Sequence, residues 1–280
     1  MLVRILTAAV GIPLLLAVVF FLPPVATAIL FALACMIGAY ELLWRTGLLK
    51  QKRIVAETAL MAAFVVMWSW AKACSIFSGE LLWASMLLAT LLFFSLLFCE
   101  LLAGHKAIRF SSLCVALFGG IVYPFLIGAL VRLRGMESGV YYILVAFVIS
   151  MVADSGAYFA GRAFGKHKLA PIISPKKTVE GAIGGVILNI GGMILYAFLL
   201  KRFFGFAQVN YLYAAIYGLV GAFGSMLGDL TFSVAKRQVG IKDYGNLFPG
   251  HGGILDRFDS TMICAPIAEV LLILIPFAVK

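Results

Sequence analysis

Charged residues are scarce in this sequence. Asp, Glu, Lys and Arg make up 12% of the 280 residues, while 64% are hydrophobic and the mean hydropathy is +1.09. Soluble domains average roughly 25% charged and 45–50% apolar residues. A water-soluble fold of this length could not bury so much apolar surface, so the composition excludes that class of protein.

Cysteines are few and are not grouped. The five cysteines (Cys35, Cys74, Cys99, Cys114 and Cys264) lie in or beside apolar runs, without a CxxC or Cys/His spacing. A disulfide framework or a zinc site is recognised in a sequence by such spacing. We therefore predict neither, and we interpret these cysteines as small packing residues.

Long apolar runs fill most of the chain. A helix needs ~20 mainly apolar residues to cross a hydrocarbon core of about 30 Å. Helices are the expected spanning element, because lipid offers no partner to unpaired backbone groups and the runs lack the alternation of barrel strands. The sequence predicts an all-α polytopic transmembrane protein with about nine helices, at residues 5–22, 25–44, 56–73, 81–99, 112–131, 140–159, 182–200, 211–230 and 261–279.

The chain shows no Pro-rich linker, soluble domain or internal repeat. We therefore expect residues 1–280 to form a single integral membrane domain. The first apolar run is longer than the roughly 7–15 residues of a signal-peptide core, so we expect it to be a retained helix.

Lys and Arg are distributed unevenly between the two sides of the predicted bundle. Alternating the nine helices places 16 of the 22 basic residues on one side and six on the other. By the positive-inside rule the rich side is cytosolic, which predicts an N-in, C-out topology, and we expect a bacterial inner (cytoplasmic) membrane. This rule and anionic lipid head groups account for the net charge of +10, so we expect no nucleic-acid partner.

Two long cytosolic connections, residues 161–181 and 231–260, carry most of the polar side chains, which places the functional motifs within residues 150–260. In the second connection, cations, carboxylates and glycines alternate. The connections on the opposite side are short and plain. We therefore expect the chemistry to take place at the cytosolic face.

Spacing predicts which of these side chains share a helix face. If the eighth helix continues past its membrane run, one face carries residues at i, i+4, i+7 and i+8, namely Asp229, Ser233, Lys236 and Arg237. Asp256 and Asp259 are three residues apart, so we expect them to share a face at the start of the ninth helix. Both sets place charge at the cytosolic membrane boundary.

This mixture of charges suits phosphate groups bound together with a divalent metal. Mg²⁺ takes carboxylate and phosphate oxygens, and Lys and Arg neutralise the remaining negative charge. Gly252 and Gly253, beside His251, allow the backbone to approach an anion closely. Each part has a plainer alternative: Asp256 and Asp259 could cap the last helix, and the cations could be interfacial anchors.

Asp154 is unusual because it lies within the sixth apolar run, in its cytosolic half. A carboxylate at bilayer depth costs ~2.5–3.5 kcal/mol on insertion scales, so we expect it to face the protein interior and to have a partner. The alternative to a functional role is a structural hydrogen bond to a neighbouring helix, helped by Ser150 or Ser155.

A second cluster enters the seventh helix. It holds Ser174, Lys176, Lys177, Thr178 and Glu180. Glu180 adds an acidic group near the helix start, and the two lysines could grip phosphate. A basic interfacial anchor is an equally simple interpretation.

Residues 233–259 closely resemble the signature of phosphatidate cytidylyltransferases, also called CDP-diglyceride synthases. They hold, in order, Ser, Lys-Arg, Lys-Asp, Pro-x-His-Gly-Gly and Asp-Arg-x-Asp, and only Ala235 departs from the larger apolar residue usual in the family. Residues 174–181 resemble the family's Ser-Pro-Lys-Lys-Thr-x-Glu-Gly motif, and residues 154–158 its Asp-containing motif. The resemblance runs from Val140 onward, while the first half matches in hydropathy alone.

This resemblance implies transfer of a cytidylyl group from CTP to phosphatidic acid within membrane lipid, giving CDP-diacylglycerol and diphosphate. It also implies Mg²⁺, with K⁺ as a candidate second cation, and a metal centre that maps by motif position onto Asp229 and Asp256, with Asp259 in support. Phosphatidate is already largely a dianion at neutral pH because the second pKa of a phosphate monoester is near 6. No covalent enzyme intermediate is therefore required. A homodimer is a candidate assembly.

The candidate residues fall into two groups under this interpretation. The expected catalytic residues are Asp229, Asp256, Lys236, Arg237, Lys242, Asp243, His251, Arg257 and Asp259, of which Asp229, Asp256 and Asp259 are expected metal ligands. The expected substrate-binding residues are Asp154, Ser174, Lys176, Lys177, Thr178, Glu180, Ser233, Gly252 and Gly253.

Two other classes of protein are less compatible with the sequence. A transporter would also bury carboxylates, but an inverted repeat and polar groups near mid-membrane are expected there and neither is visible. A CDP-alcohol phosphotransferase would carry an Asp-Gly-x-x-Ala-Arg pattern with two later aspartates, which is absent from this sequence.

Overall fold

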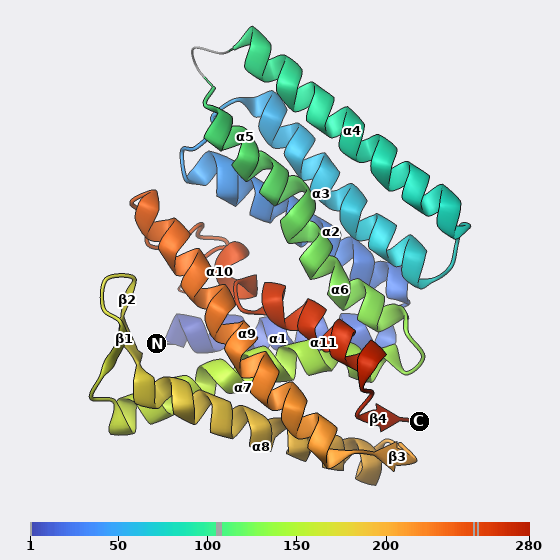
Figure 1. Ribbon diagram of the computed structural model, residues 1–280, viewed down its shortest axis with the longest axis vertical. Coiled ribbons are helices and arrows are strands. Elements are labelled where there is room, and N and C mark those ends of the chain that lie inside the picture. The colour runs from blue at the N-terminus through green and yellow to red at the C-terminus, as the bar shows by residue number, and fades with distance from the viewer. Residues whose placement is uncertain (1, 105–107, 249, 251) are drawn as a thin grey trace. The chain divides into compact units, whose positions relative to one another are not determined.

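The protein is described from a computed structural model that covers residues 2–104, 108–248, 250 and 252–280 (Figure 1). The chain divides into two compact units. Unit 1 comprises Met1–Val140 and Gln238–Phe258, and unit 2 comprises Tyr141–Arg237 and Asp259–Lys280. Each unit has its own internal packing, and the expectation of a single membrane domain stays a prediction.

Helices dominate the described residues, and seven of them are long and apolar enough to cross a membrane. These are Pro24–Arg45, Lys52–Ala73, Gly79–Ala103, Phe110–Gly135, Gly139–Phe164, Val179–Phe203 and Tyr211–Gln238. They coincide with the second to eighth expected spans. The prediction of an all-α polytopic membrane protein is therefore confirmed, with seven full-length spans found among the nine expected.

The first and last expected spans are helical, but neither is among these seven full-length spans. The first coincides with helix α1 (Leu2–Phe21). The last was expected at residues 261–279, but helix α11 covers only Thr261–Leu274. Pro276 disfavours helical backbone at the residue before it, and Ile275 accordingly has φ −141° and ψ 68°. The expected length of this span was therefore wrong. The helix has 14 residues and is only about 21 Å long.

Unit 1 contains α1 to α6 and the short helix α10 (Leu255–Phe258). Two of its long spans are interrupted by a π-helical turn: α2 (Pro24–Tyr40) continues as η1 (Glu41–Arg45), and η2 (Phe118–Val122) joins α5 (Phe110–Leu117) to α6 (Tyr123–Gly135). The spans α3 (Lys52–Ala73) and α4 (Gly79–Ala103) complete the unit. Its packing centres on α3, which contacts α2, α4 and α6.

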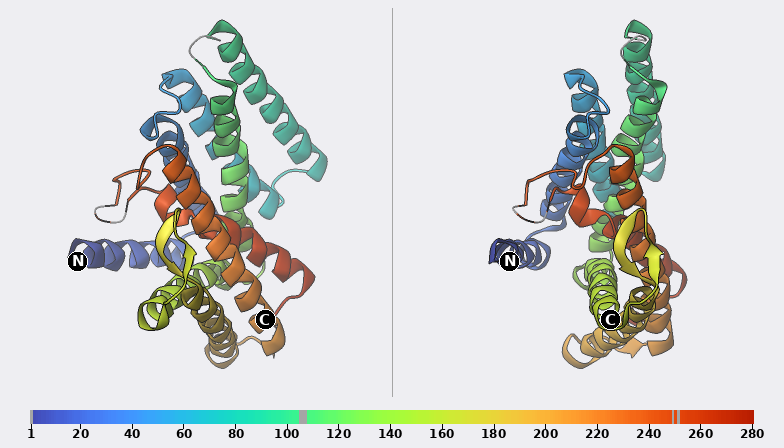
Figure 2. Two further views of the ribbon diagram at one scale, coloured as in Figure 1. Left: turned by 60° about the vertical axis from the view of Figure 1, so that its left-hand side comes forward. Right: turned by 90° about the vertical axis from the view of Figure 1, so that its left-hand side faces the viewer.

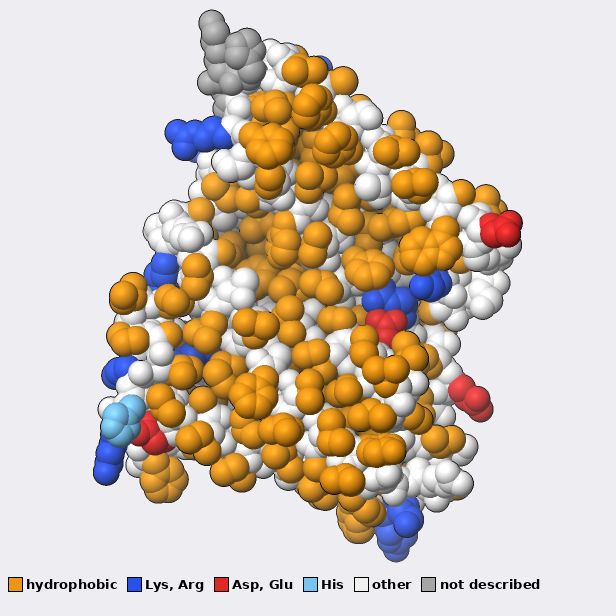
Figure 3. All heavy atoms as spheres, viewed as in Figure 1, with side chains coloured by type: hydrophobic (Ala, Val, Ile, Leu, Met, Phe, Trp, Pro, Cys, Tyr) orange, Lys and Arg blue, Asp and Glu red, His pale blue; other side chains and the backbone are white. Residues whose placement is uncertain are grey.

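Helix α4 shows how this unit divides apolar residues between its core and its surface. Phe93 is buried, whereas the next residue, Phe94, is 49% exposed. Leu87, Leu91 and Leu92 are also exposed, and hydrophobic side chains cover the face of this helix visible in Figure 3. Such an apolar, exposed helix surface is expected where a helix faces lipid.

Unit 2 contains α7 (Gly139–Phe164), α8 (Val179–Phe203), α9 (Tyr211–Gln238) and α11. Two small antiparallel strand pairs were not predicted, the first a hairpin and the second formed by strands far apart in the sequence. Strand β1 (Lys168–Ala170) pairs with β2 (Ser174–Thr178), and β3 (Gln208–Val209) pairs with β4 (Ala278–Val279). The β1–β2 hairpin projects from the same ends of α7 and α8 in both views of Figure 2.

Glycines allow α7 and α8 to approach closely. A Cβ on Gly184 would overlap the Ala160 side chain, and a Cβ on Gly181 would lie 2.7 Å from the Ala157 carbonyl oxygen. Small residues at a helix interface allow such backbone contact, which is a common way for membrane helices to pack. This contact fixes the spacing between the α7 residues and the hairpin that leads into α8.

Candidate functional site

A cavity of about 390 Å³ lies within unit 2. Side chains of α7, β2, α8 and α9 line it, and its charged and hydroxyl groups are Asp154, Tyr158, Arg162, Lys176, Lys177, Thr178, Ser225 and Asp229. Five of these eight belong to the residues that the sequence singled out as candidates. The structure therefore brings the α7, β2 and α9 motifs together.

Asp154 has the partners that its position in a spanning helix requires. Ser225 Oγ of α9 donates to Asp154 Oδ1 at 2.9 Å, and Ser260 Oγ donates to Oδ2 at 3.2 Å. The prediction that Asp154 has partners is confirmed, but the residue is exposed at the cavity instead of being enclosed in the protein interior. The partners come from two other segments, and Ser150 instead donates to the carbonyl of Phe147.

Asp229 is paired on both sides. Lys177 Nζ lies 2.5 Å from Asp229 Oδ2, and Ser233 Oγ donates to Asp229 Oδ1 at 3.2 Å. The second contact exists because α9 continues to Gln238. The predicted extension of this helix, with the candidates sharing one face, is therefore confirmed. Lys236 and Arg237 occupy its last turn.

The start of α8 is built by Thr178 and Glu180. Thr178 Oγ1 accepts a hydrogen bond from Gly181 N at 3.1 Å and caps the helix. Glu180 accepts from the backbone amides of Lys166 and His167, and its Oε1 lies 2.6 Å from His167 Nδ1. The predicted acidic group at the helix start is confirmed, and its contacts tie the hairpin to α8.

His167 was missed by the sequence analysis. It is an exposed loop residue next to lysines, and no spacing marked it as a partner of Glu180. Ser174 begins β2, and Lys176 on the same strand is exposed at the cavity. The hairpin therefore presents both lysines of the motif to the cavity.

Asp259 lies close enough to Asp229 and Asp154 to feel their charges. Gly228 brings the segment close, because a Cβ on it would overlap the Asp259 carbonyl oxygen. Burial, and after it the charge of Asp229, raises the pKa of Asp259 to about 7, while the charge of Lys236 acts in the opposite direction. Asp259 is therefore a proton acceptor close to neutrality in the absence of a bound cation.

Asp256 does not share a helix face with Asp259. It belongs to the one-turn helix α10, which ends at Phe258, whereas α11 begins at Thr261. The expectation of a common face at the start of the ninth helix was wrong, because the chain breaks its helix between them. The N-cap residue of α11 is Ser260 and not Asp256, and Asp256 Oδ2 accepts from Tyr244 N at 2.8 Å and from Gly253 N at 3.0 Å.

Gly252 and Gly253 make close approaches to carboxylates of this chain. Gly252 has φ +86°, and a Cβ on it would lie 2.7 Å from Asp256 Oδ2. A Cβ on Gly253 would overlap the carboxylate of Glu41. These contacts explain the two glycines, and their predicted role towards a substrate anion stays a prediction.

Glu41 is the second residue that the sequence analysis missed. It is 3% exposed and begins the π-helical turn η1 within a spanning helix. A carboxylate at such a position costs ~2.5–3.5 kcal/mol unless it finds partners. Its partners are the backbone amides of Ile254 and Leu255, each at 3.1 Å.

The remaining candidates do not line the unit 2 cavity. Lys242, Asp243 and Arg257 are exposed in unit 1. His251 lies outside the described residues, so its expected catalytic role stays a prediction.

The carboxylates fit a magnesium ion that takes some of its ligands from the protein and the rest from a substrate. Within the part of the chain that the structure covers, no group of three or more His, Cys, Asp or Glu side chains could hold a metal. Mg²⁺ usually keeps several waters and takes one or two carboxylates together with substrate phosphates. Asp229 and Asp154 line one cavity and meet this requirement in unit 2. The joint ligand set of Asp229, Asp256 and Asp259 stays a prediction.

Comparison with known proteins places this chain in a family. The chain is 44% identical over 147 residues to a phosphatidate cytidylyltransferase of Staphylococcus saprophyticus, covering 52% of this chain and 55% of that protein. It is 47% identical over 137 residues to the one of Staphylococcus haemolyticus (49% and 51%) and 44% identical over 137 residues to the one of Staphylococcus aureus strain COL (49% and 51%). The chain spans about half the length of the curated relatives it matches. The sequence model of the Cytidylyltransferase family matches residues 2–275. The chain therefore belongs to this family.

Proposed function

We propose that the protein is a phosphatidate cytidylyltransferase, which converts CTP and phosphatidic acid to CDP-diacylglycerol and diphosphate. The observation that carries this proposal is the unit 2 cavity, where Asp154, Lys177 and Asp229 meet at the positions of the family motifs. Membership of the cytidylyltransferase family and the names of the relatives support it.

The chemistry needs little more than positioning and charge neutralisation. An oxygen of the phosphatidate dianion attacks the α-phosphorus of CTP, the new P–O bond forms, and the bond to the β-phosphate breaks in line with it. The main obstacle is repulsion between two anions. The cations at the cavity, Lys176, Lys177 and Arg162, offset this repulsion.

The Lys177–Asp229 pair gives the cavity a neutral resting arrangement. A phosphate oxygen that enters competes with Asp229 for the ammonium group of Lys177, and the Asp229 carboxylate then becomes available to a cation. Bound Mg²⁺ would be held by Asp229 and Asp154, would lower the negative charge on the phosphates and would align the attack. K⁺ is the candidate for a second cation, with Asp259 as the adjacent carboxylate.

The other candidates complete the proposal. Lys236, Arg237, Lys242 and Arg257 bind phosphate groups of nucleotide or lipid, and Asp256 acts as a further metal ligand. We place the reaction at the cytosolic face of a bacterial inner membrane, where CTP is supplied and the acyl chains of phosphatidate remain in the bilayer. A homodimer and the roles of Asp243 and His251 stay predictions.

The test is a product assay on the purified full chain in lipid nanodiscs. CTP labelled at the α-phosphate should yield a chloroform-soluble labelled product only when phosphatidic acid and Mg²⁺ are both present. Asp229→Asn should abolish this product while the variant remains monodisperse. Label that stays water-soluble under all conditions, or transfer that needs an alcohol acceptor in place of phosphatidic acid, would refute the proposed function.

A further inference from the structure

The loop that carries Asp256 is held by a carboxylate far away in the sequence. Glu41 Oε1 accepts from Ile254 N, and Oε2 accepts from Leu255 N, both at 3.1 Å, across 213 and 214 positions of the chain. Both oxygens of the carboxylate are therefore engaged, by the two residues that directly precede Asp256. All of these residues belong to unit 1.

The backbone around Glu41 is built to receive this side chain. A Cβ on either Gly245 or Gly253 would overlap Glu41 Oε1, so the loop backbone passes directly against the carboxylate at two points. Glu41 is itself 3% exposed and begins the π-helical turn η1. Such turns within α-helices occur frequently at functional sites, because they shift where the following side chains point.

The same loop residues orient Asp256. Gly253 N donates to Asp256 Oδ2 at 3.0 Å, and Gly253 lies directly before the two amides bound by Glu41. Tyr244 N donates to the same oxygen at 2.8 Å. The carboxylate of Glu41 therefore holds the loop backbone, and this backbone in turn holds the Asp256 side chain. No direct contact between the two side chains is needed.

From this geometry we infer that Glu41 is a positioning residue for Asp256, and that it sets the affinity of Asp256 for a divalent cation. The inference rests on the proposed function in its assignment of Asp256 as a metal ligand. Residues that orient metal ligands from behind typically change metal affinity by roughly 10–100-fold when they are replaced. An amide at position 41 keeps the shape of the side chain but directs an NH₂ group at one of the two N–H donors.

The test compares Mn²⁺ binding to the full chain in detergent, measured by electron paramagnetic resonance, for the wild type, E41Q, E41D and D256N. E41Q should weaken Mn²⁺ binding by about 10-fold, E41D should weaken it less because the negative charge remains, and D256N should weaken it most. Hydrogen exchange should be faster in E41Q for peptides covering Ile254 and Leu255. E41D carries the comparison if E41Q does not give monodisperse protein.

E57Q is the matched control. Glu57 also lies in a spanning helix of unit 1, and its Oε2 is buried without a hydrogen-bond partner among the residues described. E57Q should leave both Mn²⁺ binding and exchange at Ile254 unchanged. Unchanged Mn²⁺ affinity in folded E41Q, or an equal loss in E57Q, would overturn the inference, and so would equal affinity in wild type and D256N.

This design separates the inference from the proposed function. If the wild type forms no CDP-diacylglycerol but E41Q and D256N both lose Mn²⁺ affinity, the enzymatic proposal fails and the positioning role stands. If product forms and the Mg²⁺ concentration for half-maximal activity is the same in wild type and E41Q, the positioning role fails alone.

Discussion

Lys177 Nζ lies 2.5 Å from Asp229 Oδ2, which joins the hairpin before α8 to the C-terminal half of α9. The charges of these two side chains thereby neutralise each other. Under the proposed function, these are the two residues that would change partners when a substrate phosphate binds.

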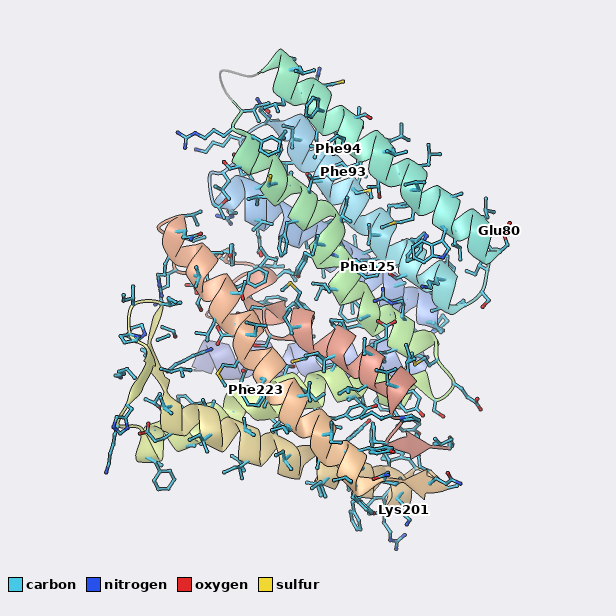
Figure 4. The ribbon with its side chains drawn as sticks, in the orientation of Figure 1. Glu80, Phe93, Phe94, Phe125, Lys201 and Phe223 are labelled. Carbon is cyan, nitrogen blue, oxygen red and sulfur yellow. The ribbon has the colours of Figure 1, made fainter. Side chains whose placement is uncertain are left out.

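Replacement of Lys177 by Met should lower kcat by about 10²–10³-fold, because a preorganised charge next to the reacting phosphate is lost. Turnover of labelled CTP in nanodiscs measures this effect. Lys201 provides the control, since it lies in the last turn of α8, at the opposite end from the hairpin (Figure 4). K201M should retain wild-type turnover, and an equal loss in both variants would contradict a specific role of Lys177.

The close contact between α7 and α8 should be sensitive to a single methyl group. Gly184→Ala places a Cβ against the Ala160 side chain, and overpacking of this kind costs about 1–3 kcal/mol. We therefore expect G184A to lower the Tm of the purified protein. Gly191→Ala in the same helix is the control, because the space around Gly191 is open among the described residues. A lower Tm in G191A than in G184A would contradict this account of the interface.

The hydrogen bond from Ser225 to Asp154 should contribute measurably to stability. Side-chain hydrogen bonds between membrane helices contribute on average about 0.6 kcal/mol and up to about 1.7 kcal/mol, so S225A should lower the free energy of unfolding by an amount in this range. Ser95 on α4 is the comparison, because its hydroxyl bonds only within its own helix, to Leu91 O. Thermal unfolding of S225A and S95A in the same detergent should separate the two cases.

Asp259 should make the stability of the cation-free protein depend on pH. Its pKa is raised to about 7 in the folded protein, compared with about 3.9 for an unperturbed Asp. Between these values the folded state binds more protons than the unfolded state, so the free energy of unfolding falls as pH rises from about 4 to 7. Its contribution is fully present below the unfolded value and is lost above the folded one.

D259N removes this titration, so Tm measured against pH in EDTA should have a smaller negative slope from pH 4 to 7 in D259N than in the wild type. Identical slopes would mean that Asp259 titrates in its ordinary range. Serine at the same position, which has no titratable group either, should behave as D259N does.

The sequence predicted the part of the site that depends on local spacing. Asp229 and Ser233 are one helical turn apart, so their contact follows once α9 is known to continue. Asp154 needed a partner because of its depth in an apolar run, and it has two. Lys177 could be linked with phosphate from its motif, but its pairing with Asp229 depends on how the hairpin folds back to α9.

What could not be predicted depends on backbone rather than side-chain pattern. Glu41 binds two amides, and every residue has an amide, so no residue type marks its partner in the sequence. The β1–β2 hairpin was missed because Ser174–Thr178 is short and polar, without the alternation of a half-buried strand. The last helix was expected to be too long because its apolar composition continues past Pro276, where the backbone can no longer stay helical.

The tight glycine contact between α7 and α8 has a mechanical consequence. Two helices that meet backbone against backbone have no layer of flexible side chains between them along which they could slide. We therefore expect Asp154 on α7 and the hairpin at the start of α8 to keep their separation when the helices move. For the proposed reaction, space for the substrates would then have to come from the α9 side of the cavity or from rotation of the lysine side chains.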